Sequence, residues 1–397
     1  MKKNGVNRRD FLRLSATAGA GAFLLPDASA ASLNPSVTKQ SNDFPVRTLG
    51  RTGIKIPIVS MGVMRADNPN VVRAAYNSGI TFFDTAHGYQ EGRNEEMLGN
   101  FFKGKPRDSF YIATKCKFRG DPDTIEDFDA MYTAMLDLSL SRLQMDFVDI
   151  FYVHDLNTPE VVKNEKVINI INKFKADGKA KFVGFSIHAA KPDVIDAAVE
   201  SGAYDVILLG YNFKQNNLKE IDESIERAVK AGIGIVAMKT MTGGTEDADG
   251  KKKINAQACL KWAWNNKNIA TAIPGFANFT ELEECLAAAK DPALSSGEKE
   301  YLASLCSQEM LYCQQCGQCL SQCPEKLPIP DLMRAYMYAY GYKNASLSKE
   351  TLLELNLAQQ MCTGCDKCTV KCVSGFKVSE KIAAITPVMQ VSDVFLT

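Results

Sequence analysis

The chain has 397 residues, of which 46% are hydrophobic and 23% are charged, an ordinary composition for a globular protein with a large core. Its 46 Lys and Arg residues balance 46 Asp and Glu residues, so no basic excess points to a nucleic acid partner. This length accommodates one domain of about 250 residues together with a smaller one.

The first thirty residues are expected to form a separate segment. Arg8 and Arg9 precede an uncharged stretch over 14–26, and residues 28–30 read Ala-Ser-Ala. This order of basic region, short apolar core and small residues resembles a twin-arginine export signal. The apolar core is shorter than the roughly twenty residues that span a bilayer as a helix. We therefore expect a signal peptide over 1–30, export to the periplasm and no transmembrane segment in the mature chain.

After a linker over 31–45, short β-branched runs alternate with longer amphipathic runs over 46–300. This alternation is typical of repeated βα units and a parallel sheet. Asp123 and Glu126 predict a capping box ahead of a helix over 128–143. Eight units predict an α/β fold of the (β/α)8 TIM barrel type, whose chemistry lies at the C-terminal strand ends. The predicted strands are 56–61, 81–85, 110–115, 147–154, 181–186, 206–211, 234–239 and 270–274.

Four polar side chains lie at the ends of the second, third and fourth predicted strands. Asp84 and Tyr89 belong to the second strand end and are five residues apart. Lys115 ends the third strand, and His154 ends the fourth. This set resembles the catalytic tetrad of the aldo/keto reductase family. The resemblance covers residues 46 to about 290, including a hairpin-like segment at 47–53 and the Ile-Pro-Gly segment at 273–275.

The resemblance implies a role in carbonyl reduction for each of these residues. Reduction places a hydride on carbon and a proton on oxygen, and a free tyrosine with a pKa of about 10 is a slow acid at neutral pH. Tyr89 is accordingly expected to be the general acid, with the Lys115 ammonium lowering its pKa. Asp84 is expected to hold Lys115 in place, and His154 to orient the substrate carbonyl.

The resemblance also implies NAD(P)H as a cofactor, but two departures from the family pattern leave its use open. The sixth predicted strand lacks the glutamine that binds the nicotinamide amide in many members. The segment 275–281 contains no Lys or Arg to bind a 2′-phosphate, so the sequence does not indicate a preference for NADPH. The positions expected to contact the cofactor are Ser186, Tyr211, Lys239, Gly275 and Asn278.

Eight of the 12 cysteines form two C-x2-C-x2-C-x3-C runs within 301–397. This spacing is typical of bacterial ferredoxins, whereas structural zinc prefers separated ligand pairs. An oxidising compartment favours disulfides, but twin-arginine export carries folded proteins, so clusters can be inserted first. We predict a small helical and loop domain with two [4Fe-4S] clusters. The resemblance implies Cys313, Cys316, Cys319 and Cys372 as ligands of one cluster, and Cys323, Cys362, Cys365 and Cys368 as ligands of the other.

Together these features predict an exported iron–sulfur oxidoreductase. It would reduce the carbonyl of a small-molecule substrate, with Tyr89 as the acid, two clusters for electron transfer and a redox protein as a candidate partner. The alternative is an electron-transfer or cluster-carrying partner protein whose barrel is a non-catalytic scaffold. Titration with NADH and NADPH distinguishes the two, since binding that bleaches the clusters favours an enzyme.

Overall fold

The computed structural model describes residues 44–396 except 119, 245–252, 309, 358–360, 364 and 366. The predicted signal peptide and nearly all of the predicted linker lie outside the described residues. Within the described part of the chain, no helix is both long enough and apolar enough to cross a membrane.

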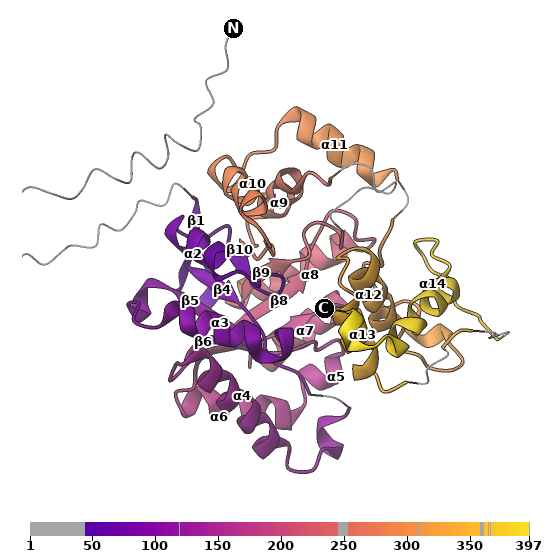
Figure 1. Ribbon diagram of the computed structural model, residues 1–397, viewed down its shortest axis with the longest axis horizontal. Coiled ribbons are helices and arrows are strands. Elements are labelled where there is room, and N and C mark those ends of the chain that lie inside the picture. The colour runs from indigo at the N-terminus through magenta and orange to yellow at the C-terminus, as the bar shows by residue number, and fades with distance from the viewer. Residues whose placement is uncertain are drawn as a thin grey trace, which may run out of the picture. The chain divides into compact units, whose positions relative to one another are not determined.

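Eight parallel strands in the described residues form a sheet that curves back on itself (Figure 1). The strands follow one another in chain order, and hydrogen bonds close the ring between the first and the last. Ser60 donates its backbone N–H to the carbonyl of Ala272, and Ala272 donates to the carbonyl of Ile58, both at 2.9 Å. The predicted (β/α)8 barrel is confirmed. Its strands are β3 (Met61–Gly62), β4 (Phe82–Asp84), β5 (Tyr111–Cys116), β6 (Val148–Val153), β7 (Ala180–Ile187), β8 (Val206–Gly210), β9 (Gly234–Met238) and β10 (Thr271–Ala272).

Helices surround this sheet and bury one apolar layer against it, while a second apolar layer fills the barrel. The helix expected over 128–143 has these bounds. Its predicted capping box is absent, because the carboxylate of Asp127 accepts the N–H of Ala130 instead. The helices are α2 (Pro69–Asn77), α3 (Arg93–Phe102), α4 (Phe128–Leu143), α5 (Pro159–Val162), α6 (Glu165–Ala176), α7 (Lys191–Ser201), α8 (Leu218–Lys230), α9 (Ala256–Asn265) and α10 (Phe279–Lys290).

An antiparallel hairpin of β1 (Val46–Thr48) and β2 (Lys55–Pro57) covers the N-terminal end of the barrel. Leu49, between its strands, is fully buried in the apolar layer inside the barrel. The predicted strand 56–61 is wrong in its bounds, since it joins the end of this hairpin to the start of β3. A continuous apolar run does not reveal where the chain changes its pairing partner. Because the hairpin covers the N-terminal end of the barrel, a binding site is expected at the C-terminal end.

Gly184 lies where β7 meets β8, and a Cβ there would sit 2.1 Å from the carbonyl oxygen of Val206. Because a strand backbone cannot move away cheaply, we expect Gly184→Ala to destabilise the fold by about 2 kcal/mol or more. Gly297→Ala is the control, since a Cβ there meets nothing within 4 Å. Thermal unfolding of the two variants checks this, and equal melting temperatures would contradict it.

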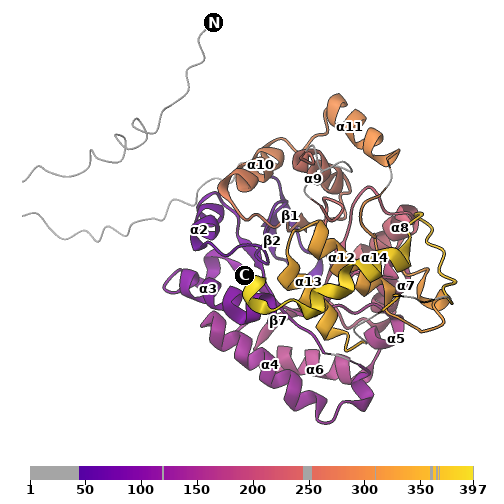
Figure 2. The same cartoon turned by 45° about the vertical axis from the view of Figure 1, so that its right-hand side comes forward.

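Residues 311–396, called the cluster module below, contain both cysteine runs. Their helices α12 (Ile329–Tyr340), α13 (Ala345–Glu354) and α14 (Val378–Ile385) share an apolar core separate from those of the barrel. Figure 2 shows these helices together in front of the barrel. The preceding helix α11 (Ser296–Cys306) runs across the predicted domain boundary at residue 300, because Leu302 and Leu305 pack against barrel residues.

Candidate active site

A cavity of about 490 Å³ lies at the C-terminal end of the barrel. Its volume is within the range typical of small-molecule sites. One wall comes from the strand ends and the loops after them, and another comes from the cluster module. The module therefore covers the end of the barrel where chemistry is expected. It contributes Arg334, Tyr338, Tyr342, Leu347, Glu350, Thr351 and Glu354 to the cavity.

The four residues predicted to be catalytic all line this cavity. Lys115 Nζ donates a hydrogen bond to Asp84 Oδ1 at 2.5 Å and another to the carbonyl of Thr85 at 2.5 Å. The same Nζ lies 5.0 Å from the ring centroid of Tyr89. The rings of Tyr89 and His154 meet edge to face, with centroids 6.0 Å apart. The structure thus brings the four together, while their catalytic roles stay predictions.

Burial determines the charge states of this group. It raises the pKa of Asp84 and lowers that of Lys115, and the charge of each partner opposes the shift of the other. Burial and the nearby Asp84 carboxylate also raise the pKa of Tyr89. The Tyr89 pKa therefore shifts in the direction opposite to the lowering expected from Lys115, with burial as the largest cause. Burial, followed by the charge of Lys115, lowers the pKa of His154 well below its usual range. Its imidazole is therefore neutral at neutral pH.

Three of the five positions predicted to contact a nicotinamide cofactor line the cavity, namely Ser186, Lys239 and Gly275. The structure places the other two elsewhere. Tyr211 donates its hydroxyl hydrogen to Asp222 Oδ1 at 2.6 Å, on the helix side of the sheet. The Asn278 side chain caps α10 by accepting the N–H of Glu281. Neither side chain is on the cavity wall.

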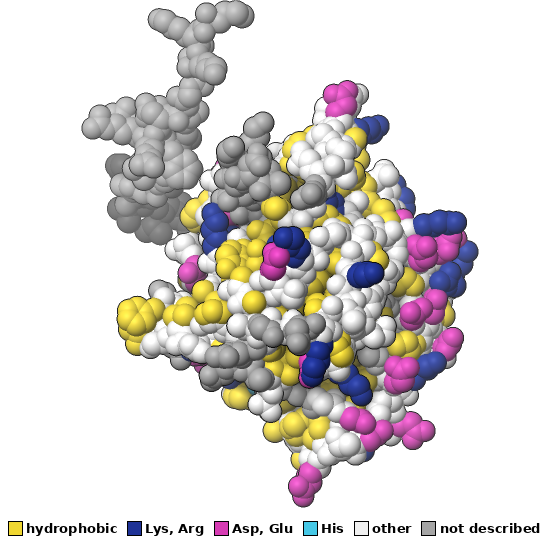
Figure 3. All heavy atoms as spheres, turned by 90° about the vertical axis from the view of Figure 1, so that its right-hand side faces the viewer, with side chains coloured by type: hydrophobic (Ala, Val, Ile, Leu, Met, Phe, Trp, Pro, Cys, Tyr) yellow, Lys and Arg dark blue, Asp and Glu magenta, His cyan; other side chains and the backbone are white. Residues whose placement is uncertain are grey.

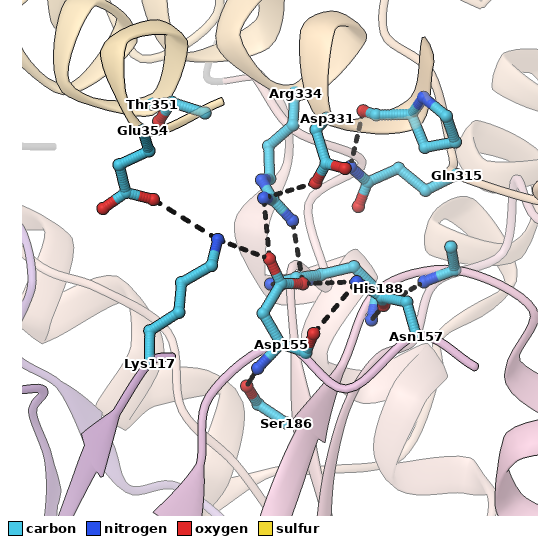
Figure 4. Close-up of polar contacts among 12 residues, drawn as sticks. Lys117, Asp155, Asn157, Ser186, His188, Gln315, Asp331, Arg334, Thr351 and Glu354 are labelled. Atoms are coloured by element: carbon cyan, nitrogen blue, oxygen red, sulfur yellow. Dashed lines mark hydrogen bonds and ion pairs between the residues drawn. The ribbon is translucent and has the colours of Figure 1, made fainter. Parts of the chain in front are cut away.

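A buried ion-pair network joins the barrel to the cluster module at the cavity (Figure 4). Arg334 of α12 donates to both carboxylate oxygens of Asp155, at 3.0 and 2.8 Å. Lys117 donates to Asp155 at 2.9 Å and to Glu354 of α13 at 3.3 Å. His188 Nε2 lies 3.8 Å from the same Asp155 carboxylate. The Arg334 and Asp155 side chains are only 4% and 5% exposed, so water screens this pair little.

Sequence reasoning missed this network. Burial alone would raise the pKa of Asp155, but Arg334, His188 and Lys117 hold it well below its usual range. Asp155 directly follows His154, so the sequence predicts that it lies at the end of a strand. Its partner Arg334 lies 179 residues further along the chain. The signal available in the sequence was that Arg334 is the one charged residue in the otherwise apolar and aromatic run 332–342.

The first cysteine run is hydrogen-bonded to the barrel beside this cavity through Gln314, which follows Cys313. Asn212 donates to the Gln314 side-chain oxygen at 2.8 Å, and Gln314 donates to the carbonyl of Thr242 at 3.1 Å. Lys191 of α7 donates to the Gln314 carbonyl at 3.4 Å. The position of the first run relative to the barrel end is therefore set by direct contacts.

The eight predicted cluster ligands form two groups in space. The first group lines one small cavity, in which the last cysteine of the second run joins three of the first. In the second group, Cys362 is close enough to Cys323, Cys365 and Cys368 for their charges to raise its pKa, after burial, to about 11. No three His, Cys, Asp or Glu side chains among the described residues converge on a single ion. Ligands that each bind a different iron of a cubane need no such convergence.

The two groups differ in exposure. Cys365 and Cys368 of the second group are exposed to solvent, whereas the cysteines of the first group are partly covered. Figure 3 shows the side of the molecule that carries the cluster module. On this side hydrophobic side chains lie among uncharged ones, and charged side chains are most frequent near one edge. The second group is thus at the surface, and the first adjoins the barrel.

The aldo/keto reductase family model matches residues 59–258, and a 4Fe-4S dicluster domain matches residues 312–383. L-galactose dehydrogenase of Arabidopsis thaliana is 27% identical over 303 residues, which cover 66% of this chain and 92% of that protein. D-threo-aldose 1-dehydrogenase of a Pseudomonas species is 26% identical over 225 residues, with 48% and 68% covered.

Among solved structures, an aldo-keto reductase from Bacillus halodurans in its holo form superimposes with a TM-score of 0.55 at 18% identity. The match covers 66% of this chain and 96% of that one, and shows a common fold. The barrel, the family match over half of the sequence and the cysteine domain agree with one another. The chain belongs to the aldo/keto reductase family of oxidoreductases and carries a 4Fe-4S dicluster domain.

Proposed function

We propose that this oxidoreductase reduces the carbonyl group of a small molecule bound between the barrel and the cluster module. The observation that carries the proposal is that one cavity is lined both by Asp84, Tyr89, Lys115 and His154 and by residues of the cluster module. A substrate in this cavity contacts the acid–base residues while it lies next to the domain that holds the redox groups.

The residues of the barrel supply the proton and orient the carbonyl. Tyr89 is protonated at neutral pH, so its hydroxyl is available to donate a proton when negative charge develops on the carbonyl oxygen. The neutral imidazole of His154 can donate a second hydrogen bond to that oxygen. Asp84 keeps the Lys115 ammonium in place beside the Tyr89 ring.

Reduction of a carbonyl to an alcohol consumes two electrons and two protons. With electrons from the clusters, Tyr89 supplies the proton on oxygen, and water supplies the proton on carbon and restores that of Tyr89. Two [4Fe-4S] clusters, when bound by the eight cysteines, supply electrons one at a time. The exposed Cys365 and Cys368 favour electron entry from a redox partner protein at the second group. Gln314, next to Cys313, contacts Asn212 and Thr242 of the barrel, so a cluster held by the first group would lie on the barrel side of the module. An NAD(P)H donor is the second candidate, favoured by Ser186, Lys239 and Gly275 on the cavity wall.

The proposal includes export by the twin-arginine route to the periplasm, which rests on Arg8, Arg9 and the apolar stretch after them. Cell fractionation of the double variant Arg8→Lys/Arg9→Lys tests it. The variant is expected to stay in the cytoplasm, and unchanged export would refute this part.

The test of the enzymatic proposal uses the anaerobically purified holoprotein. Iron and sulfide assays should give about eight of each per chain. The protein is then reduced chemically and mixed with a panel of aldehydes and ketones, and the cluster absorption is followed. Reoxidation by a carbonyl compound with formation of its alcohol supports the proposal. If no carbonyl reoxidises the clusters and neither NADH nor NADPH supports reduction, the proposal is wrong.

A further inference from the structure

Lys239 follows β9 directly and lines the cavity, with a side-chain nitrogen that is inaccessible to solvent. This nitrogen has no hydrogen-bond partner in the part of the chain that the structure describes. Lys239 also has a φ of 55°, in the left-handed region that favours glycine. Lys239 thus occupies a position where both its backbone conformation and its unpartnered amine are unfavourable, which indicates a function for the amine.

Two other cations, Arg334 and Lys191, disfavour the charged form of Lys239. The Arg334 charge, after burial, lowers the pKa of Lys239, and the ring of Tyr338 lies 5.7 Å from its nitrogen. The carboxylates that favour its charged form, Asp155 and Asp331, are both already paired with Arg334, and Asp155 also accepts from Lys117. His188, on the same wall, also leaves its Nδ1 atom without a partner among the described residues.

A negatively charged group on a ligand would correct this imbalance. An oxyanion in the cavity would accept a charge-assisted hydrogen bond from Lys239, and it would also lower the repulsion between Lys239 and Arg334. A neutral hydroxyl would satisfy the hydrogen bond but not the charge. The wall opposite the acid–base residues is therefore suited to the anionic end of a substrate.

We infer that Lys239 binds a carboxylate of the substrate, so that the enzyme acts on carbonyl compounds that carry a carboxylate, such as oxo acids or uronic acids. This inference rests on the proposed function for the reacting carbonyl, but the binding of the carboxylate is separable from turnover. A dinucleotide phosphate would offer the same chemistry, and the experiment distinguishes the two sources.

The test is calorimetric titration of the oxidised, cluster-loaded protein with two matched pairs of probes. D-glucuronate is compared with D-glucose, and pyruvate with acetone, because each pair differs mainly by the carboxylate. At least one carboxylate is expected to bind about tenfold or more tightly than its neutral counterpart. Lys239→Met should abolish this preference, whereas Lys230→Met, at an exposed position of α8, should retain it.

The inference is overturned if neither carboxylate is preferred or if Lys239→Met keeps the preference. It is also overturned if Lys239→Met weakens binding of NADH or NADPH while the carboxylates bind equally to both proteins. Cluster absorption and the melting temperature of Lys239→Met show that the variant is folded. A carboxylate preference without any turnover would refute the proposed function and leave the carboxylate site standing.

Discussion

Tyr89→Phe is expected to lower the rate of carbonyl reduction by about 10²-fold or more, while the visible absorption of the clusters stays unchanged. The variant removes one hydroxyl group from the cavity and leaves the aromatic ring beside Lys115 and His154. The Tyr89 hydroxyl is the proton donor of the proposed reaction. Among the tyrosines of the cavity wall, Tyr89 is the one whose ring lies beside Lys115. Steady-state or single-turnover rates measure the effect.

Tyr204→Phe is the matched control for Tyr89→Phe. Tyr204 is fully buried between the sheet and a helix, and its hydroxyl donates to the carbonyl of Val162 at 2.8 Å. Its removal should cost about 1 kcal/mol of stability and leave the rate unchanged. Full activity of Tyr89→Phe would show that Tyr89 is not the acid. An equal loss of rate in both variants would point to folding rather than chemistry.

Arg334→Met is expected to destabilise the packing of the cluster module on the barrel by about 3–5 kcal/mol. The substitution removes one partner of a bidentate pair and leaves the buried Asp155 carboxylate without its main counterion. Denaturation of the holoprotein, followed by cluster absorption and by fluorescence, measures the loss. Cluster absorption should be lost first, because the module is the part that is released.

The chain offers an exposed bidentate Arg–Asp pair as a control. Arg227 donates to both oxygens of Asp196 at 2.8 Å, but its side chain is 49% exposed. Arg227→Met should therefore destabilise the protein far less than Arg334→Met. If Arg334→Met costs no more than Arg227→Met, the buried network does not hold the module in place.

The sequence predicted best those features of the fold that follow from the periodic pattern of apolar residues and from the order of the strands along the chain. Alternating strand and helix patterns predicted the barrel, and parallel strands bring their C-terminal ends together, so Asp84, Lys115 and His154 had to converge. The pattern failed at 56–61, where one apolar run serves both the hairpin and the barrel. The sequence also did not predict which side of the sheet Tyr211 faces, because its strand is buried on both sides and shows no alternation of apolar and polar residues.

The role of the cluster module in the cavity could not be predicted from local patterns. The two cysteine runs indicated a separate domain, and nothing in their spacing says which surface of the barrel it covers. The contact depends on pairs such as Arg334 with Asp155 and Asn212 with Gln314, whose members lie more than a hundred residues apart. Such pairs become visible only when the fold places both partners.

The central claim is that the barrel and the cluster module act together on one substrate. The most direct test is to measure how much alcohol the reduced holoprotein forms per chain when no nicotinamide is present. Holoprotein with both clusters chemically reduced is freed of excess reductant and mixed anaerobically with a carbonyl substrate, and the alcohol is counted. Two one-electron clusters should yield about one alcohol per chain in the wild type, and Tyr89→Phe should form it far more slowly. If alcohol appears only when NADH or NADPH is added, or never, the clusters do not supply the electrons for reduction in this cavity.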